Sequence, residues 1–144
     1  MTSQPTPIAD LGLVILATSA LEVAVRFYER VFAWPVAVRT PRYVEFSLPR
    51  GLRLGIYERT GFAANTGVLP RPVADDELSG AELYVYVSDA GALGRACIAN
   101  GARPLSPWRR RDWGDEAAYF RGPDGTTLVL ARPAAGNEPV GERP

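Results

Sequence analysis

The sequence predicts an α+β fold of two βαβββ modules, each a curved, antiparallel-type mixed sheet with a helix on its outer face. A strand–helix–strands pattern occurs over residues 11–59 and recurs over residues 81–133. Within both halves, helical periodicity of 3.6 gives way to strand alternation of 2. We expect one domain, with residues 60–80 as a linker and with flexible tails at residues 1–10 and 134–144.

The first module opens with the apolar run Leu11–Thr18, which predicts a strand buried on both faces. Ser19 is the expected N-cap of a helix over Ala20–Phe32, and Glu22 completes a capping box with it. Pro35 ends this helical pattern. Three further strands are predicted, at Val36–Thr40, Tyr43–Leu48 and Leu52–Arg59.

The second module repeats this order after the segment Thr60–Gly80, which has no period and which we interpret as a crossing linker that borders a pocket. A strand at Ala81–Ser88 leads to Asp89, the expected N-cap of a helix over Ala90–Asn100. Gly101 ends this helix. The remaining strands are predicted at Ala102–Ser106, Ala117–Phe120 and Thr126–Arg132, with a tight turn at Gly122–Gly125 before the last.

The composition excludes several kinds of chemistry. The 144 residues contain no histidine, and all 16 positive side chains are arginine. The chain therefore lacks the commonest general base and metal ligand, and it lacks the lysine needed for a Schiff base. A net charge of zero gives no electrostatic footprint for nucleic acid or for an anionic membrane.

The single cysteine bears on the cellular compartment in which the protein is expected. Cys97 lies in an apolar helical pattern, which favours a buried, inert thiol over a nucleophile. A lone cysteine suits a reducing environment, and neither a signal peptide nor a membrane-spanning run is present in the sequence. These features predict a cytoplasmic protein.

Three motifs resemble a known family. Phe27–Phe32 (FYERVF) resembles the "FY..vlg" signature of the vicinal oxygen chelate superfamily, which includes glyoxalase I, bleomycin-resistance proteins and extradiol dioxygenases. Asn100–Ala102 resembles its "aaGa" helix end. Tyr119–Gly125 resembles its "yFxDPDGn" turn, with Gly122 where aspartate is usual. Together these motifs cover most of Leu11–Arg132.

The resemblance implies a pocket inside the curved sheet, and it implies a homodimer, because family members often dimerise. Most enzymes of the family hold a divalent metal with histidine, glutamine and glutamate side chains. The corresponding positions here fall on Leu13, Gly55, Glu82 and Val129. Only Glu82 can ligate a metal, whereas a catalytic metal needs about three protein ligands. The sequence therefore predicts neither a metal nor another cofactor.

Strand alternation places a polar and aromatic set on the sheet faces opposite the helices, with two tryptophans at its rim. Such a set predicts an apolar cleft with a few polar groups, which is typical of small-molecule sites. The same residues could instead form cross-strand pairs or dimer contacts. The candidate ligand-binding residues are Tyr43, Glu45, Ser47, Arg53, Tyr57, Glu82, Tyr84, Tyr86, Trp108 and Trp113.

These observations favour a metal-independent protein that binds an aromatic or cationic small molecule, similar to the bleomycin-resistance members of the family. The alternative is a metal-free lyase or isomerase in which Glu45 or Glu82 is the catalytic acid or base. A metal-dependent glyoxalase or dioxygenase and a protein-interaction module are weaker hypotheses.

Overall fold

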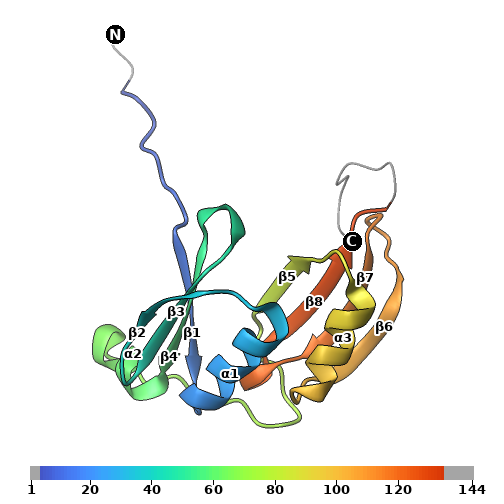
Figure 1. Ribbon diagram of the computed structural model, residues 1–144. Helices are drawn as coiled ribbons and strands as arrows, with labels where there is room; N and C mark the ends of the chain where they lie inside the picture. Colours follow the sequence, from blue (N-terminus) through green and yellow to red (C-terminus); the bar gives the residue numbers. More distant parts are fainter. Residues whose placement is uncertain (1–3, 135–144) are drawn as a thin grey trace.

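The computed structural model describes residues 4–134, which form two four-stranded mixed sheets and three α-helices (Figure 1). The exposed segment 4–12 extends away from the sheets. Most of the predicted C-terminal tail, residues 135–144, lies outside the described residues. None of the helices in the described part of the chain is long and apolar enough to cross a membrane.

Sheet A belongs to the first module and has the strand order β1-β4-β3-β2. Strand β1 runs parallel to β4, whereas the β4–β3 and β3–β2 pairs are antiparallel, so only β3 runs opposite to the other three strands. The elements are β1 (Leu13–Thr18), α1 (Leu21–Phe32), β2 (Val36–Arg39), β3 (Tyr43–Ser47) and β4 (Arg53–Glu58).

Sheet B repeats this arrangement in the second module, with the order β5-β8-β7-β6 and a parallel β5–β8 pair. The predicted repetition of a βαβββ unit is therefore confirmed. The elements are β5 (Glu82–Tyr86), α3 (Ala90–Ala99), β6 (Arg103–Arg110), β7 (Glu116–Arg121) and β8 (Thr127–Arg132).

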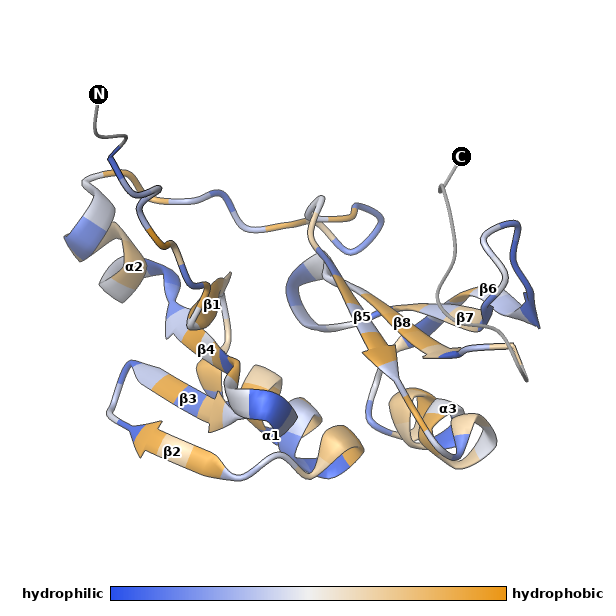
Figure 2. Ribbon diagram, turned by 90° about the horizontal axis from the view of Figure 1, so that it is seen from above, coloured by the Kyte–Doolittle hydropathy of each residue, from blue (hydrophilic) through white to orange (hydrophobic). Residues whose placement is uncertain are grey.

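One hydrophobic core joins the two modules. Helix α1 contacts α3, and each helix packs on one face of its own sheet. The apolar side chains of both sheets that face the helices belong to this core, and Figure 2 shows apolar stretches on the strands of both sheets. Its members include Val25, Tyr28, Val44, Phe46, Leu54, Ile56, Cys97, Phe120, Leu128 and Leu130. The opposite sheet faces are left free of α1 and α3.

The prediction that the first strand is buried on both faces is wrong. Strand β1 is an edge strand that pairs only with β4 within sheet A. Val14 and Leu16 pack on the core, whereas Ile15 points to the other face and is 37% exposed. Leu11, just before the strand, is 70% exposed. The continuous apolar run Leu11–Thr18 therefore forms an apolar edge of sheet A that no other strand covers in the described residues.

The helix starts differ from the predicted capping. Helix α1 has Ala20 at its N-cap position and no side-chain cap, so the expected capping box of Ser19 and Glu22 is wrong. The backbone N–H of Ser19 instead donates to Asp124 Oδ1 at 3.0 Å, which ties the turn of the second module to the start of α1. Asp89 is confirmed as the N-cap of α3, since its Oδ1 accepts from the Ala92 N–H at 3.0 Å.

The predicted linker contains a helix that sequence patterning missed. Helix α2 (Arg59–Thr66) directly follows β4, and its Gly61 lies against the ring of Tyr57. The rest of the segment is held on the second module by Arg121, which donates from Nε to the Glu77 carbonyl at 2.9 Å and from NH2 to the Ala74 carbonyl at 2.8 Å. Residues 67–80 are therefore an ordered strap that connects the modules.

Cys97 should resist thiol reagents in the folded protein. It is fully buried, and burial raises the pKa of its thiol to about 11. At pH 8 roughly 0.1% of such a thiol is ionised, so reaction with an aromatic disulfide reagent should require unfolding. The check is labelling with and without guanidinium chloride. Rapid labelling of the folded protein would contradict the buried position.

Candidate functional site

A buried carboxylate lies at the centre of the helix-free face of sheet A. Glu45 on β3 is only 5% exposed. Its Oε1 accepts a 2.6 Å hydrogen bond from the Tyr43 hydroxyl, and its Oε2 accepts one of 2.9 Å from Arg53 NH1. Burial and the hydrogen bond to Glu45 raise the pKa of Tyr43, so its phenol stays protonated and remains a donor.

The ring of Tyr43 covers Gly55 on the neighbouring strand β4. Strand pairing sets Glu45 beside Gly55, and a Cβ added at Gly55 would collide with the Tyr43 ring and hydroxyl. Tyr57 also packs against that ring, with 4.9 Å between the ring centroids. Since Glu45 and Tyr57 both hold it, Tyr43 has little freedom to move away.

Gly55→Ala should therefore destabilise the protein by about 1–3 kcal/mol, the usual cost of overpacking. Gly12→Ala is the matched control, because a Cβ at Gly12 meets only Arg53 NH2 at 4.0 Å. Urea denaturation of both variants measures the difference. Equal stability of the two variants would show that Tyr43 is not fixed over Gly55.

A second buried carboxylate, Asp115, occupies the helix-free face of sheet B. It is 4% exposed, and its Oδ2 accepts hydrogen bonds of 2.6 Å from the Tyr84 hydroxyl and 3.1 Å from the Tyr86 hydroxyl. The Tyr84 hydroxyl in turn accepts from Trp113 Nε1 at 2.8 Å. Burial and the bond to Asp115 raise the pKa of Tyr84, which keeps its phenol neutral. We call these four residues the Asp115 cluster.

Sequence reasoning missed Asp115 because the predicted strand began at Ala117. Strand β7 begins one residue earlier, at Glu116. Extending the alternation of Tyr119 and Ala117 backward by two residues puts Asp115 on the same face as the tyrosines. The signal was therefore present in the alternation but lay just outside the predicted strand.

A cavity of about 850 Å³ lies between the two modules. We call it the intermodule cavity. It runs along β5 and is closed from the first module by the β3–β4 turn, by β1 and by Trp34. It brings together four of the predicted ligand-binding residues, Arg53, Glu82, Tyr84 and Tyr86. The other lining residues are Val14, Trp34, Leu48, Pro49, Arg50, Leu52, Leu54, Leu83, Val85 and Pro133.

The remaining predicted residues do not line this cavity. Trp113 and Glu45 each contact a lining residue instead. Trp113 donates a hydrogen bond to Tyr84, and Glu45 forms an ion pair with Arg53. Trp108 lies on the helix side of sheet B, where it packs against the common core. The structure therefore separates Trp108 from the nine other candidates. The last three predicted residues that do not line the intermodule cavity are Tyr43, Ser47 and Tyr57, which lie on strands β3 and β4 of sheet A.

The carboxylates offer little as catalytic acids or bases. Glu45 is engaged on both oxygens, by a phenol and by a guanidinium. Glu82 is exposed to solvent. This arrangement can bind and orient a molecule more readily than it can transfer a proton.

Solved structures of several bacterial proteins share this architecture. No family model and no curated protein matches the chain. A glyoxalase-related enzyme from Fulvimarina pelagi is 21% identical with a TM-score of 0.76, over 87% of this chain and 88% of that one. A glyoxalase/bleomycin resistance protein/dioxygenase from Nocardioides is 25% identical with a TM-score of 0.69, over 99% and 93%. This chain has the fold of the vicinal oxygen chelate superfamily.

A lactoylglutathione lyase from Agrobacterium tumefaciens has the same vicinal oxygen chelate fold, with 21% identity and a TM-score of 0.63 over 88% of this chain and 95% of that one. The resemblance of the three sequence motifs to this superfamily is thereby confirmed at the level of the fold. Structures of this fold include proteins described as enzymes and proteins described as resistance proteins, so the fold alone does not select a function.

The metal of the vicinal oxygen chelate superfamily does not fit the residues present. Of the four corresponding positions, Leu13, Gly55 and Val129 offer no side-chain donor, and the space over Gly55 is filled by Tyr43. Within residues 4–134, no three histidine, cysteine, aspartate or glutamate side chains gather closely enough to hold a metal ion. The chemistry of the site must be derived from its aromatic and polar groups.

Proposed function

We propose that this chain is a metal-independent small-molecule-binding protein of the glyoxalase/bleomycin-resistance type, which sequesters an aromatic or cationic compound in the intermodule cavity. The observation that carries the proposal is the convergence of Arg53, Glu82, Tyr84 and Tyr86 on one cavity of about 850 Å³. This volume lies within the range of small-molecule sites, which is about 300–1,000 Å³.

The walls of the cavity favour a flat ligand. Trp34 lines it from the first module, and Tyr84 and Tyr86 line it from β5, where their rings pack edge to face at 5.5 Å. The hydroxyls of both tyrosines are turned to Asp115, which fixes the orientation of the rings. Aromatic faces held in this way offer large contact areas at a low entropic cost to the protein.

The charges near the cavity favour a cation over an anion. Glu82 lines the cavity directly, and Asp115 lies behind the two tyrosine hydroxyls. Arg53 is ion-paired with Glu45 at 2.9 Å, so the carboxylates of Glu45, Glu82 and Asp115 together outnumber the guanidinium groups of Arg50 and Arg53 by one. A compound that combines an aromatic ring with an ammonium group matches both features.

The 4-nitrobenzylammonium ion is a suitable probe, because it is flat and cationic and because nitroaromatic compounds quench tryptophan. Titration should quench Trp34 and Trp113 at a saturating 1:1 ratio. Trp108→Phe should leave this quenching intact, since Trp108 lies on the other side of sheet B. The absence of saturable quenching in this variant would refute the proposed site.

Two variants test which groups of the cavity bind the probe. Tyr86→Ala removes a wall and should weaken binding about tenfold or more, which corresponds to roughly 1.4 kcal/mol. Glu82→Gln should weaken binding of the ammonium probe a few-fold, while neutral 4-nitrobenzyl alcohol binds as before. Glu22→Gln on the exposed side of α1 is the matched control. A variant series with unchanged affinities would place the ligand elsewhere.

We also propose a homodimer, supported by the uncovered apolar edge at β1. Leu11 and Ile15 are exposed there, as is Ile8 in the segment before the strand. Sedimentation at several concentrations should reveal a dimer, and Leu11→Arg should shift it toward monomer. A monomer at all concentrations would contradict this assembly.

A cytoplasmic location stays a prediction, which the lone Cys97 favours.

A further inference from the structure

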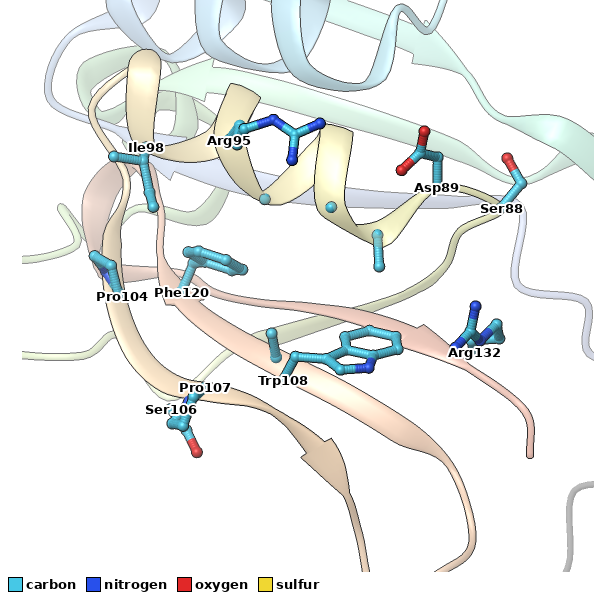
Figure 3. Close-up of a pocket in the computed structure, with 14 residues that line it drawn as sticks. Ser88, Asp89, Arg95, Ile98, Pro104, Ser106, Pro107, Trp108, Phe120 and Arg132 are labelled. Atoms are coloured by element: carbon cyan, nitrogen blue, oxygen red, sulfur yellow. The ribbon is translucent and has the colours of Figure 1, made fainter. Parts of the chain in front are cut away.

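The helix side of sheet B contains a cavity that the proposed function does not use. It has a volume of about 590 Å³ and lies between α3 and strands β6 and β7 (Figure 3). We propose that this α3 cavity is a second ligand-binding site, which takes a flat aromatic anion such as an aromatic carboxylate. It lies on the opposite face of the sheet from the Asp115 cluster.

The interior of the α3 cavity is apolar. Figure 3 shows Ile98, Phe120 and Pro104 at one end and Trp108 along the sheet side. The cavity exists because α3 has glycines where it faces the sheet. Gly94 presents no side chain, and a Cβ built there would stand 3.5 Å from the end of the Phe120 ring. A larger residue at Gly94 would fill the space, so the glycine keeps it open.

The charged groups that line the α3 cavity favour an anion. Arg95 extends from α3, and Arg132 lies at the end of β8 near the N-terminus of that helix (Figure 3). The only acidic residue among the described lining residues is Asp89, whose Oδ1 is engaged in capping α3. Arg132 is ion-paired with Glu116, so among the described lining residues Arg95 is the cation that remains for an anionic ligand.

The two arginines have different roles. Arg132 lies over the Trp108 ring at 5.5 Å and also bonds Glu116 at 3.2 Å, so its guanidinium is held in place. Glu116 additionally accepts a 3.1 Å hydrogen bond from Trp108 Nε1, which fixes the indole plane. Arg95 makes no ion pair within residues 4–134, and it is therefore the arginine available to a carboxylate.

The start of α3 adds further donors at the same end of the cavity. Ala90 and Gly91 line it, and their N–H groups belong to the first turn, where they have no acceptor inside the helix. The positive end of the helix dipole acts in the same direction as the arginines. An aromatic carboxylate can thus place its ring against Trp108 and Phe120 with its charge toward Arg95 and this helix end.

The test uses 4-nitrobenzoate, which carries the opposite charge to the probe of the intermodule cavity. It should quench Trp108 saturably, and Trp108→Phe should remove that part of the quenching. Arg95→Gln should weaken binding about tenfold or more, because one charged hydrogen bond is lost. Arg30→Gln, an exposed arginine on α1, should leave the affinity unchanged.

Gly94→Leu should abolish 4-nitrobenzoate binding by filling the cavity, provided that its melting temperature shows a folded protein. Arg95→Gln changes an exposed side chain, so it remains informative if Gly94→Leu does not fold. Tyr86→Ala and Glu82→Gln should not alter 4-nitrobenzoate binding, which makes this test independent of the proposed function. Quenching that Arg95→Gln leaves unchanged, or equal affinity for neutral 4-nitrobenzyl alcohol, would overturn the anion site.

Discussion

Tyr28→Ala should lower the free energy of unfolding by about 3–5 kcal/mol, as is usual when a large aromatic side chain leaves a core. Tyr28 is 1% exposed and is the largest fully buried side chain in the described residues. Its ring packs edge to face on Phe27 at 5.5 Å, and it also lies beside Trp34 and Phe46. The core that joins α1 to sheet A is therefore built around this ring, and urea denaturation measures its contribution.

Tyr28→Phe separates the ring from the hydroxyl. Thr126 lies near this hydroxyl, but the buried oxygen makes no hydrogen bond of acceptable geometry within residues 4–134. Removing an unsatisfied buried polar group costs little and can stabilise the fold. We therefore expect Tyr28→Phe to be as stable as the parent protein or more so. A loss above about 1 kcal/mol, the worth of an ordinary hydrogen bond, would show that the hydroxyl has a partner.

Asp115→Ala should have the largest effect on ligand binding. It leaves Tyr84 and Tyr86 without their common acceptor, so both rings can turn away from the cavity wall. It also removes a negative charge near the cavity. We expect binding of 4-nitrobenzylammonium to weaken more than tenfold, together with a stability loss of about 1–3 kcal/mol for the two hydrogen bonds that are lost. Fluorescence titration and urea denaturation measure the two effects separately.

Asp115→Asn distinguishes charge from orientation, because an amide oxygen still accepts from the tyrosine hydroxyls. This variant should weaken binding of the ammonium probe but leave binding of neutral 4-nitrobenzyl alcohol close to that of the parent. Asp112→Ala, an exposed aspartate in the same turn, is the matched control. If Asp115→Ala binds both probes normally, Asp115 has no part in the site.

Local patterns in the sequence were sufficient to predict most of the fold. Helical spacing in Leu21–Phe32 agrees with the burial that the structure shows, and alternation in Tyr43–Ser47 correctly places Val44 and Phe46 in the core. Helix α2 was missed because RTGFAANT carries glycine, threonine and asparagine, which are weak helix formers, and has little amphipathic character. Gly61 packs against Tyr57, four residues earlier, across the junction of β4 and α2, and periodicity within a single element does not reveal such a contact.

The candidate site was predictable only where strand alternation was unbroken. Tyr84 and Tyr86 follow regular alternation in β5 and line the intermodule cavity together. Trp108 was misplaced because the predicted strand ended at Ser106, whereas β6 continues to Arg110. The register shifts between Ser106 and Arg109, and such irregularities re-aim side chains in a way that simple parity cannot foresee.

The most direct test of metal-independent binding in the intermodule cavity is titration of chelator-treated Trp108→Phe protein with 4-nitrobenzylammonium. We predict saturable 1:1 quenching that does not change when zinc, nickel or iron(II) is added. We also predict that Tyr86→Ala in the same background lowers the affinity for the probe about tenfold or more. Binding that appears only after a metal is added would contradict the account.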